Sequence, residues 1–398
     1  MTQRTKVQEA LDRGEGVFRL APTWVPRSFC RPGRRLKLHP DDYFALGLKR
    51  GGIDERWFSS TTAADNGPGT PEDEGLSYLW VDENDKLLLR DALDMMGREL
   101  LGNAIMDRYG KLPLYSKFFD NMGPLPHHIH HDDKYAARVG ASGKPEMYFF
   151  PAQVNNHGGE FPFTFFGFNP GTGKDQVRKA LEDFPKGDNH ITDLSRAYRL
   201  TIDTGWNVPP GVLHAPGSLC TYEPQFASDV FAMYQSVLFG GHTVGEELLW
   251  KNCPEEEMGN IDYLMEIIDW NLNVASDLQE QFFMAPKPAG DAAAMEQEGY
   301  LLEWICYKCP IIGAQRLTVK PGRSVTIRQD TPFGAVLLQG HGRFGSHVAE
   351  TPAMIRYGQA TRDEFFVTAP AAKQGVRIHN DSVCEDLVIL MHFTINAD

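Results

Sequence analysis

The chain has 398 residues, of which 42% are hydrophobic and 23% are charged, and its formal net charge is −14. This length allows two or three structural units with a sizeable core, and the acidic balance argues against a nucleic-acid or anionic-membrane surface. No apolar stretch approaches the roughly 20 residues of a membrane-spanning helix, and MTQRTKVQEALDRGEG lacks the apolar core of a signal peptide, so we expect a cytoplasmic location.

Short apolar segments separated by glycine and proline predict a mostly β chain. The segments expected to form strands are YLWV, EMYFFPAQV, RLTID, VFAMYQSVLF, RLTVKPGRSVTI, GAVLLQG and EDLVILMHF. Apolar residues recur at helical spacing in three places only, residues 87–109, 174–184 and 260–278. The chain is therefore expected to be mostly β with a few inserted helices.

A breaker-rich connection, APKPAGDAAA at residues 285–294, marks the clearest internal boundary. The sequence beyond it has an almost purely β pattern. We expect two β-barrels joined by helices: a first barrel with helical insertions over residues 1–245, a helical connecting segment over 246–298, and a second barrel over 299–398.

The six cysteines are too sparse to predict a disulfide framework in a chain of this size. Cys306 and Cys309 form a lone Cys-x-x-Cys pair in EWICYKCPII. Because no second pair accompanies it, we interpret this segment as a buried strand with incidental thiols, not as a zinc or redox site.

Four of the chain's histidines lie within five consecutive positions in PLPHHIHHDDKYA, residues 124–136. In an extended strand, alternate side chains share a face. His128 and His130 then point one way, while His127 and His131 point the other and are expected to support the site or lie at the surface. Two imidazoles can converge on one cation, but a divalent ion needs three or four protein ligands.

Two later residues can complete such a site. Glu146 begins an apolar strand in GKPEMYFF, and His214 follows a Pro-Pro-Gly turn in NVPPGVLHAPG. His-x-His, a later Glu and then Pro209-x-Gly211-x-x-His214 resemble the two-part metal motif of the cupin superfamily. More narrowly, LPLYSKFF…PLPHHIHHDDK and the Lys-Pro-Glu-Met segment of residues 144–147 resemble type I mannose-6-phosphate isomerases, over roughly residues 50–245.

This resemblance implies two cupin, or jelly-roll, barrels, of which we expect the second to be metal-free. It implies one divalent metal ion with four ligands, His128, His130, Glu146 and His214. Zinc is the first expectation, and such a ligand set also suits Mn, Fe, Co or Ni.

The resemblance also implies a function. The resemblance implies that the protein is an aldose–ketose isomerase of carbohydrate metabolism, which would act on a small sugar or sugar phosphate through a cis-enediol. Lys144, beside a ligand, and Lys117, in LYSKFF, would stabilise the developing negative charge. Glu223 and Asp229 fall at the family's spacing after His214, so Glu223 is expected to act as the general base and Asp229 to hold sugar hydroxyls.

Two departures from the family pattern keep alternatives open. The family's first metal ligand is a glutamine, whereas this chain has His128. The resulting set of three His and one Glu also resembles Fe- or Mn-dependent cupin dioxygenases and decarboxylases, and a non-catalytic sugar-binding cupin is a third possibility. The family's arginine for the substrate phosphate is replaced around Met233, so we expect a substrate without phosphate, or one whose phosphate is held by other residues.

Overall fold

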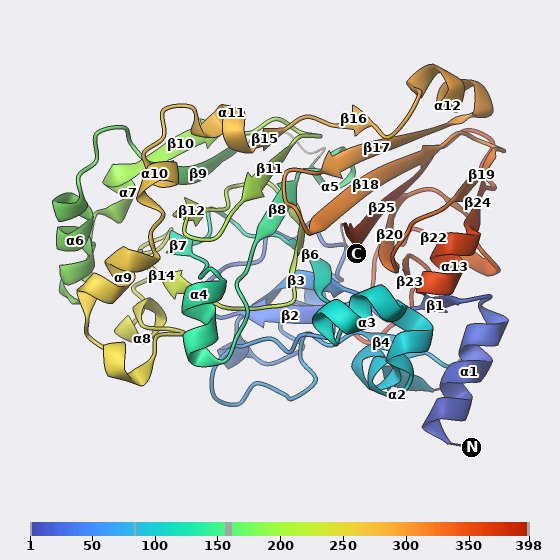
Figure 1. Ribbon diagram of the computed structural model, residues 1–398, viewed down its shortest axis with the longest axis horizontal. Coiled ribbons are helices and arrows are strands. Elements are labelled where there is room, and N and C mark those ends of the chain that lie inside the picture. The colour runs from blue at the N-terminus through green and yellow to red at the C-terminus, as the bar shows by residue number, and fades with distance from the viewer. Residues whose placement is uncertain (1, 83–84, 156–160, 396–398) are drawn as a thin grey trace.

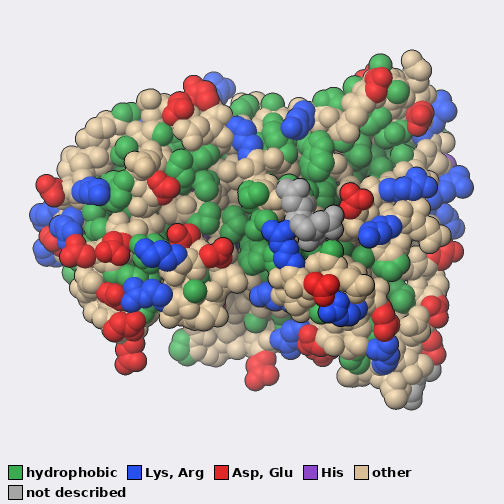
Figure 2. All heavy atoms as spheres, viewed as in Figure 1, with side chains coloured by type: hydrophobic (Ala, Val, Ile, Leu, Met, Phe, Trp, Pro, Cys, Tyr) green, Lys and Arg blue, Asp and Glu red, His purple; other side chains and the backbone are tan. Residues whose placement is uncertain are grey.

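The computed structural model describes residues 2–82, 85–155 and 161–395. Two units lie side by side, and each is built mainly from two antiparallel sheets (Figure 1). Within the described residues, no helix is long and apolar enough to cross a membrane. Acidic and basic side chains are mixed over the face drawn in Figure 2.

The first unit contains a seven-stranded and a five-stranded sheet. In order across the larger sheet, its strands are β15 (Phe283–Met284), β11 (Gly205–Val208), β8 (Glu146–Phe149), β13 (Thr221–Phe226), β6 (Leu114–Phe119), β3 (Gly52–Phe58) and β2 (Thr23–Arg27). The smaller sheet consists of β10 (Ser195–Arg199), β9 (Phe163–Phe168), β12 (His214–Ala215), β7 (His128–Ile129) and β14 (Ala232–Met233). Strands β3, β6 and β8 are buried along their whole length. Their charged residues, among them Glu55, Lys117 and Glu146, are therefore buried as well.

The second unit repeats this plan with a seven-stranded and a four-stranded sheet. The larger sheet consists of β1 (Val17–Arg19), β23 (Glu364–Val367), β20 (Phe333–Gln339), β25 (Leu387–Thr394), β18 (Ile312–Val319), β17 (Tyr300–Cys306) and β16 (Lys287–Pro288). The smaller sheet consists of β19 (Ser324–Ile327), β24 (Val376–Asn380), β21 (His341–Phe344) and β22 (His347–Glu350). Strand β1 pairs with β23, so a segment from the start of the chain belongs to the sheet of the second unit.

A short hairpin, β4 (Tyr78–Trp80) with β5 (Lys86–Leu88), and a set of helices complete the fold. The α-helices are α1 (Gln3–Arg13), α2 (Leu89–Leu101), α3 (Asn103–Tyr109), α4 (Asp133–Ala136), α5 (Ala152–Asn155), α6 (Lys174–Glu182), α7 (Ile191–Leu194), α8 (Glu246–Leu249), α9 (Ile261–Ile267), α10 (Trp270–Asn273), α11 (Leu278–Phe282), α12 (Ala292–Glu298) and α13 (Ala369–Gln374). Helices α6 to α10 lie at the outer end of the first unit (Figure 1).

The helices expected from apolar spacing are present, two of them in pieces. The segment 87–109 forms α2 and α3, separated at Gly102, whose φ is 81°. The segment 260–278 is divided because Ile268 is extended and the side chain of Asp269 accepts a hydrogen bond from the backbone N–H of Leu272, which starts a new helix.

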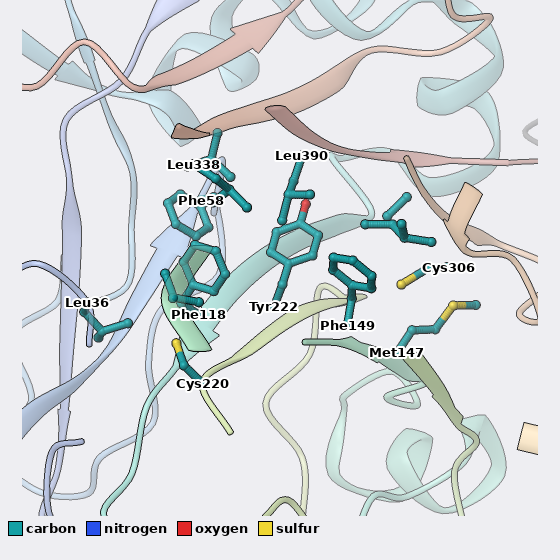
Figure 3. Close-up of a cluster of buried hydrophobic side chains, with 14 of the residues drawn as sticks. Leu36, Phe58, Phe118, Met147, Phe149, Cys220, Tyr222, Cys306, Leu338 and Leu390 are labelled. Atoms are coloured by element: carbon teal, nitrogen blue, oxygen red, sulfur yellow. The ribbon is translucent and has the colours of Figure 1, made fainter. Parts of the chain in front are cut away.

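A shared hydrophobic core joins the two units. Figure 3 shows Phe118 and Tyr222 of the first unit together with Leu338 and Leu390 of the second, and all four belong to one buried cluster. Cys306 lies in the same cluster and is fully buried, in keeping with a strand thiol that packs as a small hydrophobic side chain.

A buried ion pair also crosses between the units. Arg56, on β3, binds both carboxylate oxygens of Asp363 at 2.8 and 2.9 Å, and its Nη2 lies 3.3 Å from Glu364 on β23. The Arg56 and Asp363 side chains are almost completely excluded from solvent. Removing Asp363 would leave Arg56 with Glu364 as its acidic neighbour. Because burial raises the pKa of Glu364 to about 8, the buried charge of Arg56 would then be poorly compensated.

We expect the substitution Asp363→Asn to lower the free energy of unfolding by about 3 to 5 kcal/mol, because Arg56 would keep its charge and lose its bidentate partner. Urea unfolding followed by circular dichroism measures this change. The matched control is Asp386→Asn, which removes an exposed pair with Lys320 and should change stability little. Equal effects of the two substitutions would contradict a stabilising role for the inter-unit pair.

Candidate metal centre

Three of the histidines expected to bind metal meet on neighbouring strands of the five-stranded sheet. His128 begins β7, His130 directly follows that strand, and His214 begins β12. The register places His214 opposite His128. Each imidazole offers one ring nitrogen, and these nitrogens lie within 4.8 Å of one another. That spacing suits three donors to a single ion.

The Pro-Pro-Gly turn before His214 fixes the approach of this strand to the histidine run. The backbone N–H of Gly211 donates to the carbonyl of His130 at 2.9 Å. Gly211 has a φ of 79°, and a Cβ at this position would lie 3.1 Å from the backbone of both Ile267 and Asp269. Only glycine meets both conditions without strain.

All three imidazoles are oriented in the same way by the backbone. In each ring, Nδ1 lies within hydrogen-bonding distance of a main-chain carbonyl: Pro126 at 2.6 Å for His128, Val230 at 2.8 Å for His130 and Val212 at 2.8 Å for His214. A carbonyl only accepts, so Nδ1 carries the hydrogen and Nε2 keeps its lone pair. This arrangement is typical of metal-binding histidines, whose second nitrogen is held by an outer partner.

Glu146, the first residue of β8, reaches this cluster from the opposite sheet. Its Oε2 lies 3.0 Å from Nε2 of His130, and its Oε1 lies 3.3 Å from Nε2 of His214. Nε2 of His214 is buried without a hydrogen-bond partner among the described residues, and Oε2 of Glu146 has the ammonium group of Lys144 at 3.0 Å. Lone pairs directed at one another in a buried site are unfavourable unless a cation accepts them, so these residues fit a divalent metal ion.

The protonation states of these groups also suit a metal. Burial lowers the pKa of His130 to about 4, although the neighbouring Glu146 opposes this shift. Burial and the adjacent His214 hold the pKa of His128 well below its usual value. For Glu146, burial would raise the pKa, but His130 and Lys144 outweigh it and the pKa stays well below normal. Neutral imidazoles and an ionised carboxylate are the forms that bind metal.

Two buried lysines lie beside this cluster. Lys117 on β6 and Glu223 on β13 face each other in the strand register, with Nζ and Oε1 3.3 Å apart. Nζ of Lys144 lies 3.0 Å from Glu146 and 3.8 Å from Glu223. Burial and the nearby Glu146 raise the pKa of Glu223 to about 8, against the effect of both lysines. The four residues form one connected ionic network.

Arg27, at the end of β2, is a member of the site that the sequence analysis missed. Its Nε lies 3.1 Å from Oε1 of Glu55, its Nη1 donates to Asn66 at 2.8 Å, and its Nη2 lies 3.6 Å from Asp229. The only local signal is a charged residue that closes an otherwise apolar strand, TWVPR. Arg27 thereby connects Asp229, an expected site residue, with Glu55.

A pocket lies directly beside the histidines, between the two sheets of the first unit. Its lining consists of Arg27, Phe29, Glu55, Lys117, Leu125, Pro126, His128, His130, Lys144, Asp229, Phe231 and Met233. Glu223 is not in this lining, and its carboxylate lies close behind the ammonium groups of Lys117 and Lys144. The pocket thus contains two of the histidines and three of the four residues to which catalytic roles were assigned.

The other two histidines of the run belong to the core and not to the surface. His127 is 1% exposed and His131 is fully buried. Nδ1 of His127 lies 2.7 Å from Oε1 of Gln235, and its ring packs against Phe165. The surface position considered for these residues is therefore wrong, because both sheet faces are covered here.

Sequence comparisons find no match for this chain, neither a protein-family model nor a curated protein. Solved structures do match. A mannose 6-phosphate isomerase from Bacillus subtilis has a TM-score of 0.63 at 14% identity, over 95% of this chain and 99% of that one. A mutant phosphomannose isomerase from Salmonella typhimurium has a TM-score of 0.63 at 11% identity, and a zinc-bound mannose 6-phosphate isomerase 0.62 at 12%, each with the same coverage.

These matches extend through both units and confirm the mostly β, two-barrel cupin fold expected from the sequence. At 11 to 14% identity they concern the arrangement of the chain and not its substrate. With three histidines in metal-binding geometry at its centre, the chain has the fold of type I mannose 6-phosphate isomerases.

Proposed function

We propose that this protein is a metal-dependent aldose–ketose isomerase that interconverts two sugars through a cis-enediol. One observation supports this most directly: the clustered imidazoles of His128, His130 and His214 and the carboxylate of Glu146 adjoin a pocket with two buried lysines. The fold shared with mannose 6-phosphate isomerases supports the same reaction class.

His128, His130, Glu146 and His214 would hold the ion, and zinc is our first choice because a structure of the same fold contains it. When bound, a divalent ion polarises a substrate carbonyl and stabilises negative charge that develops on oxygen. Three imidazoles and one carboxylate are compatible with zinc and also with Mn, Fe, Co or Ni.

The remaining site residues would handle the proton and the charge. Lys144 and Lys117 present ammonium groups to the pocket, where they can stabilise an enediolate oxygen. In our proposal, Glu223 accepts the proton removed beside the carbonyl and returns it to the neighbouring carbon. Because Glu223 lies behind the lysines, this transfer passes between them. Asp229 lines the pocket and would accept hydrogen bonds from sugar hydroxyls.

A redox function is the second candidate, since His128 replaces a glutamine of the isomerase pattern and completes a set of three His and one Glu. Fe- or Mn-dependent cupin dioxygenases and decarboxylases use such a set. A non-catalytic sugar-binding cupin would have no use for two buried ammonium groups beside the metal ligands, and burying them is costly.

The test is an anaerobic assay of the metal-loaded protein on a panel of aldoses and ketoses, each free and phosphorylated. We expect aldose–ketose exchange without oxygen, detected by NMR of the sugar products. Turnover that requires O₂, with no exchange between aldose and ketose, would replace the isomerase by the redox enzyme.

A further inference from the structure

Every cationic side chain that lines the pocket is already paired with a carboxylate. Arg27 lies 3.1 Å from Glu55 and 3.6 Å from Asp229. Lys117 lies 3.3 Å from Glu223 and 3.7 Å from Glu55. Because these side chains are buried, each pair replaces the lost solvation of its partners.

Lys144 completes this pattern through Glu146, at 3.0 Å, and Glu223, at 3.8 Å. The network thus links three basic side chains, Arg27, Lys117 and Lys144, with four acidic ones, Glu55, Glu146, Glu223 and Asp229. A divalent ion would add its positive charge at the histidines, where the carbonyl reacts, and not where the far end of a sugar would lie.

Apart from His128 and His130, the rest of the lining is apolar and offers no donor to an anion. It consists of Phe29, Leu125, Pro126, Phe231 and Met233. Met233 is buried and lies opposite His128 in the strand register, so its place beside a ligand strand is fixed by the sheet. At this position the resemblance to the isomerase family leads one to expect an arginine.

We infer that the pocket selects an uncharged sugar and discriminates against sugar phosphates; this inference rests on the proposed isomerase function. Arg27 is then a specificity-determining residue. It does not bind a substrate anion. Instead it holds the carboxylates of Glu55 and Asp229 in place by ion pairing. Both residues line the pocket, where carboxylate oxygens accept hydrogen bonds from the hydroxyl groups of a neutral sugar.

A second pocket adjoins the first and could bind a phosphate group in its place. It shares Phe29 and Pro126 with the first pocket and contains Arg31. Within the part of the chain that the structure describes, Arg31 has no ion-pair partner. A phosphate at the end of a longer ligand would meet its cation there.

Ligand-observed NMR titrations of the zinc-loaded parent protein with fructose, fructose 6-phosphate and inorganic phosphate test the inference. We expect the free sugar to bind more tightly than its 6-phosphate by roughly ten-fold or more, because the phosphate finds no free cation. We also expect inorganic phosphate not to displace the sugar. Tighter binding of the 6-phosphate, or binding of neither sugar, overturns the inference.

Two variants sharpen the result. Met233→Arg should raise the affinity for fructose 6-phosphate relative to the affinity for fructose, since it adds one unpaired cation. Should that variant not fold, Arg31→Gln provides the independent arm, with Arg34→Gln, outside both pocket linings, as its control. Loss of 6-phosphate binding in Arg31→Gln alone assigns the anion to the outer pocket and overturns the inference, whereas unchanged binding supports it.

The exchange assay tests the isomerase function, and the titrations test the charge preference of the pocket, so the two proposals can fail independently. If the free sugar binds but no aldose–ketose exchange occurs with any sugar in the panel, the isomerase proposal fails while the charge preference of the pocket stands. If exchange occurs but only with phosphorylated sugars, the isomerase proposal stands and the preference for neutral substrates fails.

Discussion

The combined substitution His130→Ala and Glu146→Gln is expected to lower the metal content of the purified protein from about one ion per chain to background. It removes two donors that lie 3.0 Å apart and that come from the two opposite sheets. His128 and His214 alone cannot complete a coordination shell. Elemental analysis after dialysis measures the loss, and isomerisation should disappear with the ion.

A second readout does not depend on activity. Ligand binding to the native state stabilises it by about 4 kcal/mol when the free ion is at a thousand times its Kd. A chelator should therefore lower the Tm of the parent protein and leave that of the double variant unchanged. His127→Gln is the matched control, because His127 belongs to the same histidine run but bonds to Gln235. If the double variant retained a full equivalent of metal, this site would not be the metal centre.

The grouping of the histidines could be predicted because its determinants are local. Alternation along a strand places His128 and His130 on one face. The Pro-Pro-Gly turn before His214 indicates that this histidine also lies at the end of a strand. What alternation could not supply is the pairing of these two strands. That pairing follows from the sheet order, in which β12 lies between β7 and β9.

The position of Arg27 could not be predicted from such patterns. The register between β2 and β3 shifts: Val25 pairs with Glu55, but Pro26 pairs with Ile53, so Asp54 is the extra residue of a bulge. A bulge changes which side chains face the same way. The contact between Arg27 and Asp229 moreover joins segments about two hundred residues apart, and no local pattern encodes such a distance.

The helical expectations show the same division between local and long-range causes. Apolar spacing identified the helical segments, yet 260–278 is interrupted where Asp269 caps a new helix. A backbone neighbour explains the interruption, since the N–H of Asp269 bonds to the carbonyl of Gly211 in the turn before His214. The helix is therefore interrupted by a backbone contact with the turn that precedes His214.

Glu223→Gln is expected to preserve the fold and the metal ion while slowing isomerisation by about 10² to 10⁴, the usual contribution of a positioned general base. Glutamine has the same shape but does not take up a proton. The exchange measurement is specific for this role: in D₂O, the parent enzyme should incorporate solvent deuterium at the carbon beside the carbonyl, and the variant should lose this exchange together with turnover. Metal content and Tm verify that the variant is folded.

Stability needs a separate control, because Glu223 also neutralises Lys117 at 3.3 Å. Lys117 retains Glu55 at 3.7 Å in the variant, which limits the cost of the substitution. Glu303→Gln on β17 is the matched control: it also removes a strand carboxylate paired with a cation, Arg316, but in the second unit, and it should leave turnover unchanged. A Glu223→Gln protein that exchanges deuterium and turns over its sugar at the parental rate would exclude Glu223 as the base. Lys144 would then be the next group to vary, because it is the ammonium group nearest both Glu146 and His130.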